Sequence, residues 1–258
     1  MIWWLVACRP APVAFPARTV DYDEVVLTAS AGSSLESTVR YRIEPGRSDV
    51  WVVATLRTEG VVYDEGAPVM HYDSDTPKGA DAWPLVLQHA IAARPAAVRV
   101  DTRGRPVALD DPATWADDAL AALAQAPVPP AALGNDRLVD PDGYIANLAR
   151  TFPGHPPRGD WVRDERLAGL RARRTEICQP IGRVEGLPAV RCEGSCTADD
   201  DPRGTLYGAT CWTEVRTDRE GIVTIESGYS GTLIRTGSDG QAEDLPVAGQ
   251  RLVRRVGS

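Results

Sequence analysis

Lysine is almost absent from this sequence. Lys78 is the single one, and arginine supplies nearly all of the positive charge, for which a high-GC coding bias is the simplest explanation. The 28 basic residues are outnumbered by 36 acidic ones, which gives a formal net charge of −8. A nucleic-acid backbone binds to basic surfaces because every phosphate is negatively charged. The charge balance therefore argues against nucleic acid as a partner.

Long hydrophobic runs and nucleotide-binding motifs are missing as well. After residue 10, no segment approaches the roughly 18 consecutive apolar residues that a membrane-spanning helix needs. There is no Gly-rich phosphate-binding loop and no dinucleotide fingerprint. Gly228-Tyr229-Ser230-Gly231 departs from the G-x-S-x-G nucleophile elbow, because residue 232 is threonine. These absences leave no motif for an enzyme, and we expect neither a cofactor nor a metal.

Five cysteines are the strongest chemical signal that is present. Four of them lie close together in the C-terminal third, and Cys8 stands alone. An even cluster favours two disulfides, which form in an oxidising compartment. Four cysteines allow three pairings. Zinc binding is the alternative, but the C-x3-C spacing within the cluster differs from the usual C-x2-C. We favour disulfides across two successive hairpins, Cys178–Cys192 and Cys196–Cys211.

The start of the chain suggests export. Leu5-Val6-Ala7-Cys8 resembles the lipobox of bacterial lipoproteins, where a cysteine after a small residue receives a lipid. The resemblance implies a signal over residues 1–8, shorter than usual, so that we expect the true start upstream. It also implies a lipid anchor on Cys8 and, because Arg9 and not aspartate follows, the outer membrane. A chance match before a buried cysteine is the alternative. Residues 9–19 contain three prolines and read as an extended tether.

Residues 20–258 are predicted to form one α+β domain. Alternation with period two predicts strands over 20–30, 37–43 and 50–58, with 61–63 continuing the meander. The middle of the chain has helical spacing and one hairpin turn, Thr102-Arg103-Gly104-Arg105. Strands, then helices, then strands favour a curved antiparallel sheet with two or three helices on one side. The predicted helices are 82–93, 113–125 and 144–152, and the later strands 161–167, 172–178, 189–196, 205–216, 221–234 and 252–256.

Three stretches support a family resemblance when taken together. They are VMHYDSDTP (69–77), VRVDTRGRPV (98–107) and PPRGDWVRD (156–164). In this order they resemble a family of bacterial envelope lipoproteins with a "DS", a "V-x-D-x-x-G-x-V" hairpin and a "G-D-x-W" element, the last one residue shorter here. Such proteins are similar to the half-barrel lipoprotein-carrier fold, whose concave face can hold a lipid. The resemblance implies no catalytic residues, because none are established for that family.

Two groups of side chains are candidates for a site. Trp51, Trp83 and Trp115 supply core bulk or line a ligand cavity. His71, Asp73 and Asp75 alternate along a strand and therefore share a face, which an acid/base or metal site would need. The simpler interpretation of the second group is a polar strand end, followed by an Asp-rich turn before a helix.

Three functions follow from these observations. The first is a non-enzymatic envelope lipoprotein, facing the periplasm or the cell surface, that binds a hydrophobic ligand or lipid between sheet and helices. The second is a structural or protein-interaction module, with no partner indicated by the sequence. The third is a hydrolase that uses His71 and nearby carboxylates. An unfilled pocket between sheet and helices would favour the first, a filled core the second, and His71 beside a carboxylate in a cleft the third.

Overall fold

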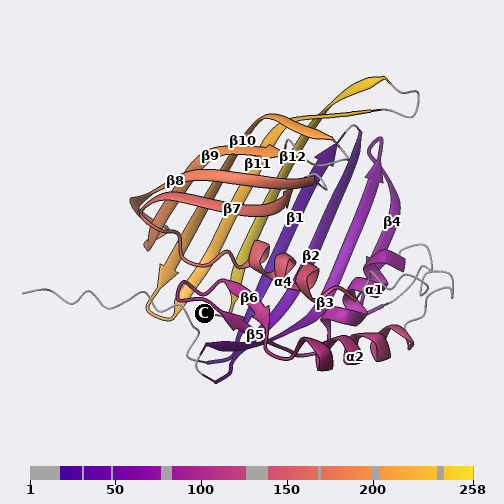
Figure 1. Ribbon diagram of the computed structural model, residues 1–258, viewed down its shortest axis with the longest axis vertical. Helices are drawn as coiled ribbons and strands as arrows, with labels where there is room; N and C mark the ends of the chain where they lie inside the picture. Colours follow the sequence, from indigo (N-terminus) through magenta and orange to yellow (C-terminus); the bar gives the residue numbers. More distant parts are fainter. Residues whose placement is uncertain are drawn as a thin grey trace, which may run out of the picture.

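The computed structural model describes residues 18–30, 32–47, 49–76, 83–125, 139–167, 170–198, 204–236 and 241–257. Within these residues, twelve strands form one antiparallel sheet, and three helices lie against it (Figure 1). Residues 1–17, which include the expected signal segment and most of the expected tether, lie outside the described residues. Cys8 is among them, so its lipid anchor stays a prediction.

The first and last strands of the sequence are neighbours in the middle of the sheet. β1 (Val20–Ser30) pairs on one side with β2 (Ser33–Pro45) and on the other with β12 (Ala242–Val256). The full order is β6-β5-β3-β2-β1-β12-β11-β10-β9-β8-β7, with β4 also paired to β3. The remaining strands are β3 (Val50–Asp64), β4 (Ala67–Asp73), β5 (Ala96–Val100), β6 (Pro106–Leu109), β7 (Gly159–Leu167), β8 (Leu170–Val184), β9 (Leu187–Ala198), β10 (Thr205–Asp218) and β11 (Gly221–Thr236).

The helices fill one end of the concave face. α1 (Trp83–Ala92), α2 (Pro112–Leu123) and α4 (Pro141–Thr151) lie across the lower part of the sheet in Figure 1. Asp111 and Asp140 cap the second and third of these, because each side chain accepts a backbone N–H of the first turn and proline follows. Phe152, directly after α4, inserts into the core with its ring edge-on to Tyr22, Tyr41 and Trp51.

The strands β7 to β9 curl over the other end of the concave face (Figure 1). Along β8 the inward residues alternate with exposed ones, from Leu170 to Cys178. Two disulfides fasten these strands, Cys178–Cys192 between β8 and β9 and Cys196–Cys211 between β9 and β10. The predicted pairing is confirmed, and zinc is not what these cysteines hold. Because such bonds form under oxidising conditions, the protein belongs to a non-cytoplasmic compartment.

The fold class predicted from the sequence is confirmed, as an open curved sheet with helices on one side. Several strand boundaries differ from those predicted. Residues 61–63 belong to β3 and are not a separate strand, because β3 runs without a break to Asp64. The strand expected to carry His71, Asp73 and Asp75 is β4, which runs from Ala67 and ends at Asp73, before Asp75. β12 begins ten residues earlier than the expected start at residue 252. Among the described residues, no helix is long and apolar enough to cross a membrane.

Candidate functional site

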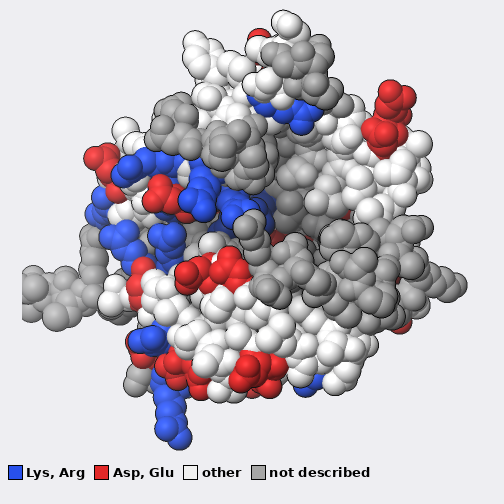
Figure 2. Space-filling model, turned by 45° about the vertical axis from the view of Figure 1, so that its right-hand side comes forward, with Lys and Arg blue, Asp and Glu red and all other residues white. Residues whose placement is uncertain are grey.

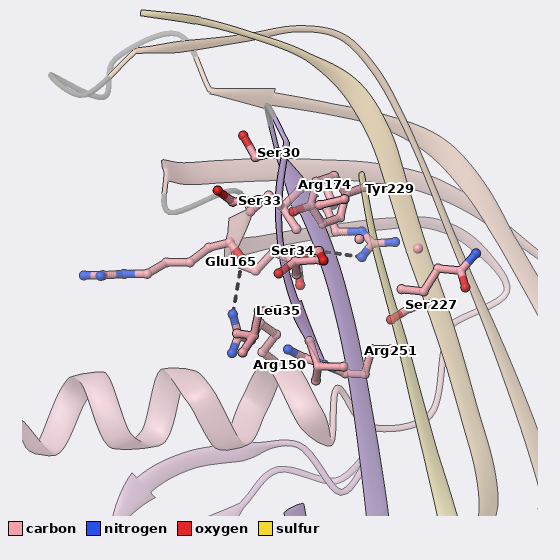
Figure 3. A pocket seen from close by; sticks show the side chains of 18 of the residues that line it. Ser30, Ser33, Ser34, Leu35, Arg150, Glu165, Arg174, Ser227, Tyr229 and Arg251 are labelled. Atoms are coloured by element: carbon pink, nitrogen blue, oxygen red, sulfur yellow. Dashed lines mark hydrogen bonds and ion pairs between the residues drawn. The ribbon is translucent and has the colours of Figure 1, made fainter. Parts of the chain in front are cut away.

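A pocket of about 450 Å³ occupies the part of the concave face that the helices leave open. The sheet forms its floor, the end of α4 closes it below, and β7 closes it from the side (Figure 3). Figure 2 shows a hollow on this face of the molecule, with arginine side chains gathered on one side of it. The lining residues come from β1, β2, β3, α4, β7, β8, β11 and β12. Its size falls within the range of small-molecule sites.

Small residues keep this part of the concave face hollow. Serine, alanine and glycine provide much of the lining, where bulky side chains would otherwise meet across the sheet. Gly249 has a specific reason for lacking a side chain: a Cβ there would lie 2.4 Å from the Tyr229 ring. The tyrosine therefore lies across Gly249 and forms part of the floor. The small lining residues on the same face as Val26 are Ser30, Ser33, Ser227 and Gly249.

A buried carboxylate, Glu24, organises the boundary between the core and the pocket. It is 4% exposed and lies within 2.9 Å of three partners. One oxygen accepts from Tyr41, and the other accepts from Thr151 of α4 and pairs with Arg251 of β12. Burial and the charge of Glu24 raise the pKa of Tyr41 well above its usual value, so that its hydroxyl keeps its proton. Glu24 thus ties α4 to the centre of the sheet.

A second buried network lies under β7. Arg174 donates to Glu165 at 2.8 Å and to Glu176 at 2.7 Å, and Glu176 also accepts from Arg163 at 2.5 Å. Thr213 joins the same network. Burial raises the pKa of Glu165, but the guanidinium groups of Arg174 and Arg163 outweigh it and hold that pKa below its usual value. Glu165 is therefore a paired carboxylate and is not an available base.

Arg150, in the last turn of α4, is the remaining charged side chain that points into the pocket from below (Figure 3). Its Nη1 donates to the carbonyl of Arg166 at 3.5 Å, which is a long hydrogen bond. Desolvation and the neighbouring charge of Arg251 lower its pKa. Arg150 is therefore a half-buried cation whose Nε is shielded from water.

The predicted site residues lie elsewhere. Trp51 and Trp115 are 4% and 6% exposed and pack in the core with the helices, so they supply core bulk, the first of the two roles expected for them, and do not line this pocket. The Trp83 side chain lies outside the described part of the chain. His71 is exposed, and its Nε2 is 3.8 Å from Glu59, beyond hydrogen-bond distance. Asp73 accepts from the backbone of Asp75 and from Arg57, which makes it a turn residue.

The residues of the pocket were not found from the sequence. The single signal is a charge at an inward position of an alternating strand, as for Glu24 between Tyr22 and Val26. In β8 this signal is hidden, because arginines occupy both faces of the strand. Within the described residues, no group of three histidine, cysteine, aspartate or glutamate side chains could hold a metal ion.

The fold and the pocket define a half-barrel protein: an open antiparallel sheet whose concavity is filled at one end and hollow at the other. No protein-family model matches the sequence, and no curated protein matches it. Among solved structures, the fold is similar to lipovitellin, in a structure that concerns lipid–protein interactions, with a TM-score of 0.54 and 10% identity. The likeness covers 94% of this chain and 25% of the lipovitellin chain, and at this identity it concerns the fold alone.

Proposed function

We propose that the protein is a non-enzymatic binding protein of the bacterial envelope that holds a hydrophobic ligand, such as a lipid, in the hollow end of its half-barrel. The observation that carries the proposal is the 450 Å³ pocket between sheet, α4 and β7. Its walls include Val26, Leu35 and Val62, so that an apolar group would leave water on binding. The fold likeness to lipovitellin, which has lipid–protein interactions of its own, supports the proposal.

The cellular setting is part of the same proposal. The lipobox-like Leu5-Val6-Ala7-Cys8 and the proline-containing tether support anchoring to the outer membrane through Cys8. The two disulfides also support a location outside the cytoplasm, because such bonds persist in an oxidising compartment. Mass spectrometry of the intact protein extracted from membranes tests this part. A mass increase on the peptide that begins with Cys8 is expected, and an unmodified Cys8 thiol would contradict it.

Two neighbouring residues of β1 test ligand binding. Val26 lines the pocket, and Leu27 points to the opposite face and is 43% exposed, since successive side chains of a strand alternate. Val26→Trp should fill the pocket and reduce binding of the neutral apolar dye Nile red by about tenfold or more, as expected for a lost apolar contact area. Leu27→Trp is the matched control and should leave binding unchanged. Equal binding by both variants and the unmodified protein would show that the dye binds elsewhere.

A protein-interaction module is the second candidate, and one observation favours it. The helix-covered end of the concavity is solid: Trp51, Trp115 and Phe152 fill it together with residues of α2 and α4. A protein whose concavity were filled along its whole length would have only its outer surface for binding. The Nile red measurement separates the two, because a pure interaction module would bind no dye at the position of Val26.

A further inference from the structure

The charges around the pocket do not balance locally. Four arginines and three glutamates point into this side of the half-barrel, and three of the arginines have a carboxylate partner within 2.9 Å. Arg251 pairs with Glu24, and Arg163 and Arg174 pair with Glu176. Within the described residues, Arg150 has no ion pair, although it lines the same pocket.

The carboxylates nearest to Arg150 are already committed. Glu24 is bound by Tyr41, Thr151 and Arg251, and Glu165 is held by Arg174. The Nε of Arg150 is buried without a hydrogen-bond partner. A guanidinium has five N–H donors, and a half-buried cation is more stable with an anion beside it, because part of its hydration is lost. The negative end of the α4 dipole offsets only a part of this cost.

The surroundings of Arg150 are apolar on the side of the sheet. Figure 3 places Leu35 beside it, and Val26 and Val62 line the same pocket. Serines of the β1–β2 hairpin, Ser30, Ser33 and Ser34, form the far side. The pocket thus has a cation at one end of an apolar wall, which is the arrangement that an acidic group joined to an apolar chain would match.

We propose that the pocket binds an anionic amphiphile, whose carboxylate or phosphate pairs with Arg150 and whose apolar part lies against Val26, Leu35 and Val62. This inference rests on the proposed function and names the class of its ligand. The planar guanidinium can donate two parallel hydrogen bonds to a carboxylate or phosphate, which adds geometric selectivity to the charge. Both head groups are anions, and comparing a carboxylate with a phosphate amphiphile tells which of the two the pocket prefers.

The test is displacement of Nile red from the full chain at pH 8 by four amphiphiles of equal chain length, each below its micelle concentration. They are dodecanoate, dodecyl phosphate, dodecanol and dodecyltrimethylammonium. Dodecanoate, dodecyl phosphate or both should displace the dye at concentrations about tenfold below those of dodecanol, as a charge-assisted hydrogen bond predicts. The cationic amphiphile should be weakest. The stronger of the two anions identifies a fatty-acid-like or a phospholipid-like head group.

Two variants assign the preference to one side chain. Arg150→Gln should remove the tenfold advantage of the anions over dodecanol. Arg166→Gln is the matched control, because Arg166 lines the same pocket but is exposed, and it should keep the advantage. If both variants lose it equally, a general basic rim is responsible and Arg150 is not the partner. Circular dichroism checks that each variant is folded.

The failure of this inference is distinguishable from the failure of the proposed function. If dodecanol and dodecanoate displace the dye equally well from the unmodified protein, the anion preference is wrong and apolar binding stands. If Nile red does not bind at all, both proposals are overturned. The comparison of the four amphiphiles uses the unmodified chain, and therefore remains decisive even if Arg150→Gln does not fold.

Discussion

Tyr22 illustrates how a single buried side chain makes stability depend on pH. It is 5% exposed, and its hydroxyl donates to the carbonyl of Ile222 at 3.0 Å. Burial raises the pKa of Tyr22 from 10.0 to about 12. Between these two values the unfolded chain loses this proton while the folded chain keeps it. The folded state therefore binds more protons, and its stability falls as the pH rises through this window.

The prediction compares the unmodified protein with Tyr22→Phe. From pH 9 to pH 11, the stability advantage of the unmodified protein over the variant should shrink by about 1.3 kcal/mol, since one pKa unit corresponds to 1.36 kcal/mol. Urea unfolding at each pH measures the two free energies. A constant difference across this range would mean that Tyr22 ionises alike in both states, against the structure.

At the same scale, the sequence predicted the disulfides but not the pocket. Four clustered cysteines allow only three pairings, and the expected hairpins favour disulfides between cysteines that are neighbours in the chain. Glu24, Arg150 and Arg174 instead depend on which face of a strand or helix becomes the inside. That face is set by the contacts of α4 with β1 and with β7, which lie far apart in the sequence. The sequence left two roles open for the tryptophans, because large aromatic side chains fill cores as well as line cavities, and Trp51 and Trp115 fill the core.

Among the elements, β4 and β12 begin at positions that the sequence did not predict, and each has an identifiable reason. β4 follows a two-residue turn, Glu65-Gly66, in which both residues have positive φ. Such turns usually carry asparagine or aspartate before glycine, so that glutamate gave no hairpin signal. β12 contains Pro246, which argues against a central strand. The structure resolves this conflict, because pairing with β1 ends at Val247 and Pro246 lies where β12 has a neighbour on one side only.

The two disulfides that link β8 to β9 and β9 to β10 are expected to raise the free energy of unfolding. The two disulfides have sequence separations of 14 and 15 residues. In the chain-entropy model, each should therefore contribute about 3 kcal/mol by constraining the unfolded chain. Cys178→Ala with Cys192→Ala, and Cys196→Ala with Cys211→Ala, should lower the free energy of unfolding by similar amounts in urea titrations. A midpoint unchanged by reduction of the unmodified protein would show that the bonds do not stabilise it.

For the whole molecule, the sequence predicted the order of strands and helices and the curvature, but not how the strands are arranged. Nothing local in β1 and β12 indicates that they pair, although this pairing forms the middle of the sheet. Nor does the sequence tell which end of the concave face is filled. That follows from where the helical segment meets the sheet: the last residue of α4, Thr151, donates to Glu24 of β1.

Because β1 pairs with β12, the two ends of the described chain lie side by side in the sheet and could be joined. Asp21 lies opposite Val256. If residues 18 and 257 were joined by a short linker and the chain were opened before β7, every strand except β4 would pair with the next one along the chain. Such a circular permutant should keep the sheet and refold faster than the natural order, since loops between pairing strands are shorter.

A second permutant supplies the control. Opened at the Glu185-Gly186 turn, the joined chain would place β8 last and β9 first, and their pairing would again span the whole sequence. It should not gain speed over the natural order. Stopped-flow refolding of the three chains measures this, and equal rates would show that the central pair does not limit folding. In the natural order, the pair at the middle of the sheet can form only after β12 has been synthesised and exported.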